Sequence, residues 1–231
     1  MTRSDRVLTV LTVISGIGIL ASVVMALWVA PDAGGLTVDN TFAQRIIYFH
    51  VPSAWLSMLA FGVTTIASIG YLIKSQRNWD SLAASSAEIG LVFTLAAMAS
   101  GSVWAKPAWN TWWTWDPRLT TYTIMFLLYV AYFMLRSAME DPVRRARFAA
   151  VYGIFAFLSV PITFMSIRWW RTIHPVLIDA TQGFGLSPNM MASFFFCLAA
   201  FTLFYVVLVM HRYRLEQLRE QVEALKEQLG Y

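Results

Sequence analysis

Two histidines in this 231-residue sequence stand where imidazoles are suited to bind a ligand. His50 lies in the segment IYFHVPSAW and His174 in RWWRTIHPVL, and a proline follows each within two residues. Proline suits the first turn of a helix, and the residue directly before a proline favours an extended conformation. We therefore expect both imidazoles near helix ends, outside the seams in which helices pack. The third histidine, His211, is expected at a solvated helix end.

A dense group of tryptophans lies between these two histidines. The segment WAKPAWNTWWTWDPRLT, residues 104–120, contains five of the ten tryptophans of the chain. Indoles collect at membrane interfaces, so an aromatic belt is the simplest explanation. The crowding instead favours a platform for a planar ligand. The candidate ligand-binding residues of this segment are Trp104, Trp109, Trp112, Trp113, Trp115, Asp116 and Arg118.

Haem is the ligand that uses both features. Its iron accepts axial histidines, and the two faces of a porphyrin stack on indoles. Zinc generally requires three or four protein ligands, and the nearby aspartates have no compact metal-binding spacing. Copper remains an alternative on the same two histidines but leaves the tryptophans without a role. Outer-face cations are available for the haem propionates: Arg45, Lys106, Arg118, Arg168 and Arg171.

The composition identifies the setting in which this site must be built. Hydrophobic residues make up 58% of the chain and charged residues 13%, about half the roughly 25% usual in soluble proteins. This balance excludes a soluble enzyme, a disordered protein and a nucleic-acid binder. The single cysteine, Cys197, excludes an internal disulfide framework and a CxxCH motif, so any haem is bound non-covalently.

Six apolar stretches are long enough to cross a hydrocarbon core about 30 Å thick. They are continuous rather than alternating, which predicts helices, and the fold class is all-α with six transmembrane helices in a single domain, 1–231. The first stretch exceeds the length of a signal-peptide core, so we expect a retained helix. The predicted spans are residues 7–30, 52–73, 86–104, 121–139, 148–168 and 189–210.

An even number of spans places the loops after spans one, three and five on one side of the membrane. His50, the tryptophan segment and His174 then share a face, and nine of the ten tryptophans lie at that face. With the N-terminus in the cytoplasm, twelve of the 17 lysines and arginines lie on the cytoplasmic side. The positive-inside rule therefore favours two cytoplasmic termini and an outer site.

Residues 211–231, which follow the sixth span, have a different pattern. Leu215, Leu218, Val222, Leu225 and Leu229 are separated by three and four residues in turn. This spacing is typical of a coiled-coil seam. Two heptads are short for an independent coiled coil, and the segment is expected to form a cytoplasmic amphipathic helix against the membrane or a partner subunit.

The tryptophan segment resembles the WWD signature of haem-handling proteins, and with six spans and two flanking histidines the whole chain resembles the CcmC family. The resemblance implies that His50 and His174 are axial ligands of haem b and that the seven residues of the tryptophan segment contact the ring. Ala105 and Asn110 stand where glycines are expected in the family, and Pro117 where a small residue is usual.

The resemblance also implies a location and partners. Members of this family lie in the bacterial inner membrane beside an ABC-type complex of CcmA and CcmB and a small membrane subunit, CcmD. They present haem at the periplasmic surface to the haem chaperone CcmE for cytochrome c maturation. Related CcmF and CcsA proteins share the WWD segment but differ in length or in number of spans.

Two other classes of protein remain as alternatives. A permease would move a small molecule through the bundle, but the central parts of the predicted spans contain no charged residue. A structural scaffold would use the tail helix and leave the outer residues without a role. No nucleophile–base pair, P-loop or dinucleotide motif is present, so the sequence predicts a binding and transfer protein and not an enzyme.

Overall fold

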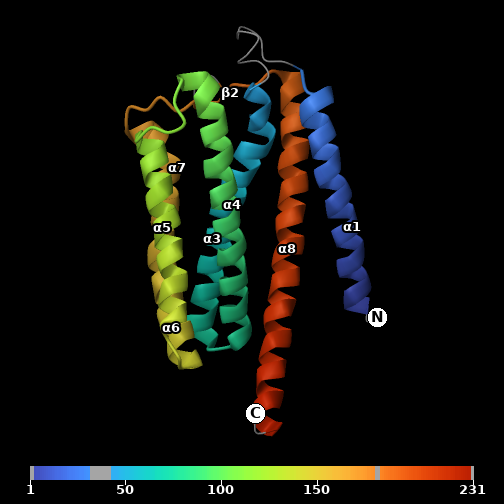
Figure 1. Ribbon diagram of the computed structural model, residues 1–231, viewed down its shortest axis with the longest axis vertical. Coiled ribbons are helices and arrows are strands. Elements are labelled where there is room, and N and C mark those ends of the chain that lie inside the picture. The colour runs from blue at the N-terminus through green and yellow to red at the C-terminus, as the bar shows by residue number, and fades with distance from the viewer. Residues whose placement is uncertain (1–2, 32–42, 180–182, 230–231) are drawn as a thin grey trace.

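Six long helices form the protein, whose computed structural model describes residues 3–31, 43–179 and 183–229 (Figure 1). The all-α prediction with six spans is confirmed, because all six are long and apolar enough to cross a membrane. A two-residue antiparallel pair is the only sheet among these residues. The elements are α1 Arg3–Val24 with the π-helical turn η1 Met25–Val29, η2 Gln44–Ile46, α3 Ile47–Lys74, α4 Arg77–Trp109, α5 Pro117–Ser137, α6 Pro142–Phe157, α7 Ser159–Trp169, β1 Ile178–Asp179, β2 Gly183–Phe184 and α8 Pro188–Leu229.

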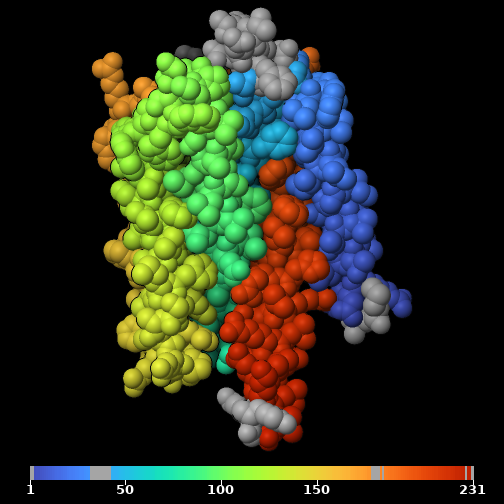
Figure 2. Space-filling model, in the orientation of Figure 1, coloured from blue at the N-terminus to red at the C-terminus, as the bar shows by residue number. Residues whose placement is uncertain are grey.

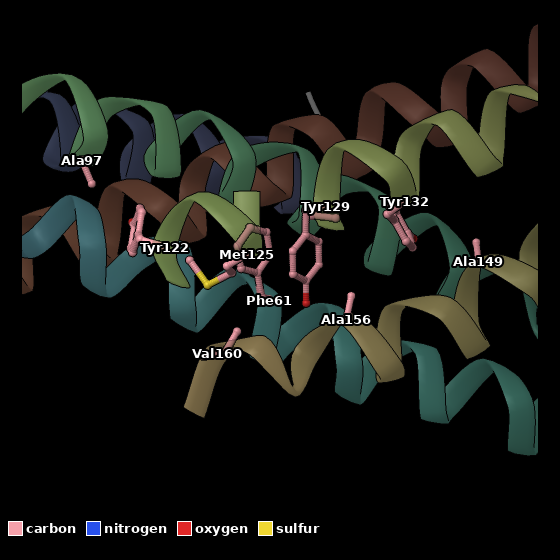
Figure 3. Packing of buried hydrophobic residues seen from close by; sticks show 10 residues of the cluster. Phe61, Ala97, Tyr122, Met125, Tyr129, Tyr132, Ala149, Ala156 and Val160 are labelled. Atoms are coloured by element: carbon pink, nitrogen blue, oxygen red, sulfur yellow. The ribbon is translucent and has the colours of Figure 1, made fainter. Parts of the chain in front are cut away.

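Helices α3 and α4 form the centre of the bundle. On one side they pack against α5 and α6, and on the other against α8, which in turn carries α1 at the edge (Figures 1 and 2). The main core is aromatic: the rings of Phe61 and Tyr129 are stacked with centroids 3.4 Å apart, beside the buried Met125 and Tyr132 (Figure 3). Large apolar side chains such as Leu20 and Ile73 are exposed on the outer faces, as expected of helices that contact lipid.

The start of the second span differs from the expectation for His50. Helix α3 begins at Ile47 and contains both His50 and Pro52, so this proline does not lie in the first turn. A proline inside a membrane helix leaves backbone carbonyls without their donors, and nearby hydroxyls compensate. Here Pro52 has no N–H for the carbonyl of Tyr48, and Ser53 Oγ donates to the neighbouring carbonyl of Phe49 at 2.7 Å. His50 lies in the α3–α4 seam, because its Nδ1 contacts Ala97 and Ser100 of α4, and the prediction of a position outside such seams is wrong.

The fifth span is divided by a proline. Helices α6 and α7 meet at Leu158, three residues before Pro161. The ring of a proline clashes with the carbonyl four residues earlier, which interrupts regular α-helical hydrogen bonding at this point. The two parts still form one crossing, residues 142–169, and bring the chain back to the end of the bundle at which α3 begins.

The sixth span and the predicted tail helix are one element. No glycine or proline occurs between residues 189 and 229, so nothing in the sequence ends the helix near residue 211. His211 consequently lies within α8 and not at a helix end, and its Nε2 is 2.8 Å from Thr12 Oγ1 of α1. The predicted span and the predicted tail helix are therefore two parts of one continuous helix, α8.

Candidate functional site

A cavity of about 200 Å³ lies at one end of the bundle, between α3, α4, α5, α7 and the segment that follows α7. Both His50 and His174 line it, so the prediction that they share one end of the protein is confirmed. The remaining walls are mainly apolar and aromatic. The lining residues are His50, Val51, Ala54, Ala97, Met98, Gly101, Trp104, Trp109, Trp113, Arg118, Leu119, Tyr122, Phe164, Ile167, Arg168, His174, Pro175 and Leu177.

The orientation of the His50 imidazole follows from its neighbours on α4. Its Nδ1 is 3.1 Å from the carbonyl oxygen of Ala97 and 3.1 Å from Ser100 Oγ. A carbonyl can only accept, so Nδ1 carries the proton and donates it. The lone pair is then on Nε2. Metal-bound histidines characteristically donate their second nitrogen to a carbonyl in this way.

His50 also depends on the absence of a side chain at Gly101. A Cβ at this position would lie 2.9 Å from Cε1 of the His50 ring, closer than real Cβ contacts allow. The glycine therefore leaves room for the imidazole against α4, where its Nδ1 contacts Ala97 and Ser100. Gly101 lies one helical turn before Trp104. The same face of α4 therefore provides the surface against which His50 packs and the Trp104 side chain that lines the cavity.

His174 adopts the same tautomer by a different route. Its Nδ1 is 3.0 Å from the carbonyl oxygen of Pro175, so Nδ1 donates and Nε2 keeps the lone pair. Burial, and after it the positive charge of Arg118, lowers the pKa of His174 from 6.5 to about 4. The imidazole is therefore neutral at pH 7. The stability that this neutral group contributes is lost as the pH falls from about 6.5 towards 4.

The cavity is thus lined by two imidazoles, each with its Nδ1–H engaged by a backbone carbonyl. No group of three or more histidine, cysteine, aspartate or glutamate side chains suited to a metal ion occurs among the described residues. This argues against a zinc site, which requires at least three protein ligands. A metal whose other positions are already filled by its own ligand, such as haem iron, needs only two.

The predicted tryptophans divide into two groups. Trp104, Trp109 and Trp113 line the cavity, and the first two meet edge to face with centroids 5.0 Å apart. Trp112 and Trp115 do not line it and are 59% and 73% exposed. The platform interpretation therefore suits three indoles, whereas an interfacial position suits the other two.

Asp116 does not line the cavity either, but it fixes the segment that carries His174. As N-cap of α5 it accepts from the Arg118 backbone N–H at 2.9 Å, and Pro117 occupies the first turn. Its other oxygen accepts from Thr172 Oγ1 at 2.5 Å and from the Ile173 N–H at 3.0 Å. Burial raises the pKa of Asp116, but these hydrogen bonds outweigh it and the pKa is lowered overall.

Two cations lie at the cavity, Arg118 and Arg168. Arg118 Nη1 donates to the carbonyl of Thr163 on α7, which holds the guanidinium beside His174. The other outer cations are not part of the lining. Arg45 donates instead to the carbonyls of Ala26 and Leu27, and Lys106 to Asn110, so the sequence-based set of five narrows to two.

Sequence reasoning missed several lining residues, of which Tyr122 is the most polar. Its hydroxyl is 2.8 Å from Ser57 Oγ. It follows Arg118 by four residues on α5, a spacing that places the two on one helix face and could have identified it. Met98, Phe164 and Leu177 carry no comparable sequence pattern, since only the tertiary fold brings them to the cavity.

The departures from the family pattern are accommodated by the backbone. Asn110 ends α4 in the left-handed region, at φ 56°, a conformation that asparagine tolerates better than most residues other than glycine. Ala105 is buried at 1% exposure without interrupting α4. Pro117 is at the start of α5, where its missing N–H has no helical partner to lose.

We predict that Asp116→Asn loosens the His174 segment. An amide retains one acceptor oxygen but loses the charge that strengthens the three hydrogen bonds. Hydrogen exchange at the Ile173 amide should accelerate about tenfold, the equivalent of one charged hydrogen bond. Asp141→Asn is the matched control, because Asp141 caps α6 before Pro142 in the same way and contacts no cavity segment. Unchanged exchange at Ile173 in Asp116→Asn would contradict this role.

Fold and cavity together define a class: a multi-pass helical membrane protein with a largely apolar and aromatic cavity at one end of its bundle. The family model of Heme exporter protein C, CcmC, matches residues 1–228, and the chain belongs to this family. Heme exporter protein C of Bradyrhizobium diazoefficiens is 39% identical over 183 residues, which cover 79% of this chain and 70% of that protein.

Two further relatives agree with this assignment. Heme exporter protein C of Haemophilus influenzae is 34% identical over 185 residues, covering 80% of this chain and 74% of that protein. A putative cytochrome c biosynthesis ccmC-like mitochondrial protein of Marchantia polymorpha is 30% identical over 180 residues, covering 78% of this chain and 75% of that protein.

Proposed function

We propose that this protein binds haem b non-covalently at the end of the bundle that contains the cavity and transfers it for cytochrome c maturation. One observation carries the proposal. Two imidazoles, His50 and His174, line one cavity walled by indoles, and the Nδ1 of each lies within hydrogen-bonding distance of a backbone carbonyl oxygen. The names of the relatives, Heme exporter protein C, support the same ligand.

In this proposal His50 and His174 bind the haem iron from opposite faces. Each Nδ1–H is already engaged by a backbone carbonyl, which fixes the ring and increases the basicity of Nε2. The low pKa of His174, about 4, means that no proton has to leave its ring before the iron binds at neutral pH. Haem is the cargo of this site and not the cofactor of a reaction, and no catalytic residue is proposed.

The other predicted residues contact either the porphyrin ring or its propionates, or position the residues that do. Trp104, Trp109 and Trp113 stack against the porphyrin, and Arg118 with Arg168 pairs with the propionates. The cavity is smaller than the roughly 300–1,000 Å³ of typical ligand pockets, so part of the ring projects from its mouth. Trp112 and Trp115 extend the aromatic surface there. Asp116 acts as a positioning residue for the His174 segment.

A partly exposed ring suits transfer to another protein. We propose that the cavity faces the periplasm from the bacterial inner membrane, with both termini in the cytoplasm, because twelve of the 17 lysines and arginines then lie inside. The recipient is a CcmE-like haem chaperone. CcmA and CcmB, as an ABC-type complex, and a CcmD-like small subunit complete the machinery, and ATP hydrolysis belongs to these partners.

The experiment is a spectrum followed by a transfer assay. Protein purified from haem-replete cells should show a Soret band, and a purified CcmE-like chaperone should acquire haem from it. The His50→Ala, His174→Ala double variant should be colourless and should fail to restore cytochrome c maturation in a strain that lacks its own family member. A colourless unchanged protein, together with full maturation by the double variant, would reject the proposal.

A further inference from the structure

A second cavity lies at the opposite end of the bundle from the histidines. It encloses about 360 Å³ between α4, α5, α6 and α8, and five arginines contribute to its walls. In Figure 2 the yellow α5–α6 pair and the red α8 flank the lower part of the green α4. The arginines are Arg77, Arg136, Arg145, Arg212 and Arg219.

Four of these arginines already have carboxylate partners. The strongest pair is the bidentate contact of Arg136 with Asp80, which is largely buried, whereas Arg219 and Glu223 are 68% and 56% exposed. Paired guanidinium groups leave little unbalanced charge for an additional anion. The pairs are Arg77 with Glu220 at 2.8 Å, Arg136 with Asp80 at 2.5 and 3.0 Å, Arg212 with Glu88 at 2.8 Å and Glu216 at 3.0 Å, and Arg219 with Glu223 at 3.1 Å.

Arg145 is the exception. Within the described parts of the chain its side chain forms no ion pair, and its Nε is buried without a hydrogen-bond partner. A buried polar group of this kind is costly unless water or an ion satisfies it. A guanidinium presents several N–H donors in one plane, a geometry that matches the oxygens of a phosphate.

We propose that this cavity binds a phosphate anion through Arg145, with the headgroup of an anionic membrane lipid as its natural source. The cavity lies between helices at the rim that the proposed orientation places in the cytoplasmic leaflet, whose lipids are anionic. Basic pockets between membrane helices on that side are suited to such headgroups. Exposed ion pairs such as that of Arg219 and Glu223 contribute little free energy. Arg219 can therefore leave Glu223 and donate hydrogen bonds to the phosphate beside Arg145.

The experiment compares lipid binding by the full chain and its variants in detergent, measured by native mass spectrometry. Phosphatidylglycerol should be retained about tenfold more by the unchanged protein than by Arg145→Gln, the loss expected for one charged hydrogen bond. Phosphatidylcholine, whose phosphate charge is balanced, should be retained weakly by both. Arg144→Gln is the matched control, because Arg144 is exposed on the same helix and does not line the cavity.

Inorganic phosphate distinguishes the two sources of the anion. If millimolar phosphate displaces phosphatidylglycerol from the unchanged protein, the site takes the free ion. If it does not, the lipid is required. Equal retention of phosphatidylglycerol by the unchanged protein and Arg145→Gln, with no phosphate binding by either, would overturn the proposal. Arg145→Lys, which keeps the charge, should retain more lipid than Arg145→Gln and serves if the latter does not fold.

The haem spectrum of the same samples tests the haem proposal independently of the phosphate site. Because Arg145 lies at the other end of the bundle, Arg145→Gln should leave the Soret band unchanged. If the protein is colourless, the double histidine variant supports full maturation and the two lipids are still distinguished, the haem proposal alone is rejected. A normal spectrum without lipid discrimination would reject the phosphate site alone.

Discussion

The His50→Gly variant is expected to lose the spectrum of haem bound by two histidines and to bind haem about a hundredfold more weakly. The reason is that His50 and His174 are the two histidines that line the cavity, and the proposal assigns one axial position of the iron to each. Glycine also leaves the space of the ring empty against Gly101 and Ala97. The measurement is a haem titration of the purified variant followed by its visible absorption.

Free imidazole should reverse this loss. An added imidazole can occupy the vacated space and restore the axial ligand, whereas a protein that has merely lost its fold cannot be restored in this way. His211→Gly is the matched control, since His211 lies in α8 at the other end and contacts Thr12. If His50→Gly keeps the two-histidine spectrum without imidazole, His50 is not a ligand.

The Gly101→Ala variant is expected to weaken haem binding by about tenfold to a hundredfold, although residue 101 donates nothing to the ligand. The new methyl group would lie 2.9 Å from His50 Cε1 and 3.4 Å from Nδ1, so the ring must move away. That movement breaks the contacts that hold Nδ1 against α4. Gly62→Ala, whose Cβ would lie at an ordinary 3.8 Å from Phe157, should bind haem normally.

A double variant separates this explanation from a general effect on packing. In the His50→Gly background no ring is present to collide with, so Gly101→Ala should have almost no additional effect on haem affinity. The coupling between the two substitutions should therefore be nearly as large as the effect of Gly101→Ala alone. Fully additive effects would show that residue 101 acts independently of His50.

The sequence was sufficient for the features that depend on the membrane. Six apolar stretches had to be helices, because lipid offers no partner for exposed backbone groups, and an even number of spans brought His50 and His174 to one end. The helix limits were less predictable. Pro52 suggested the start of a helix, yet α3 begins five residues earlier and continues through this proline.

The roles within the tryptophan segment depended on contacts that sequence spacing does not reveal. Asp116 turns towards Thr172 and Ile173, more than 50 residues away along the chain. Trp112 and Trp113 are adjacent, but α4 has ended at Asn110, and only Trp113 reaches the cavity. Neither helical nor alternating periodicity applies to such a turn, so the division among its indoles required the structure.

The uninterrupted course of α8 has a mechanical consequence. Its 42 residues form a rod about 63 Å long. Near one tip, Met190 packs beside Tyr48, two residues from His50. The other end carries a row of exposed apolar side chains, which are Leu215, Leu218, Val222, Leu225 and Leu229. Because no glycine or proline interrupts α8 between these two ends, we expect a tilt at the exposed leucines to shift the packing beside His50 as well.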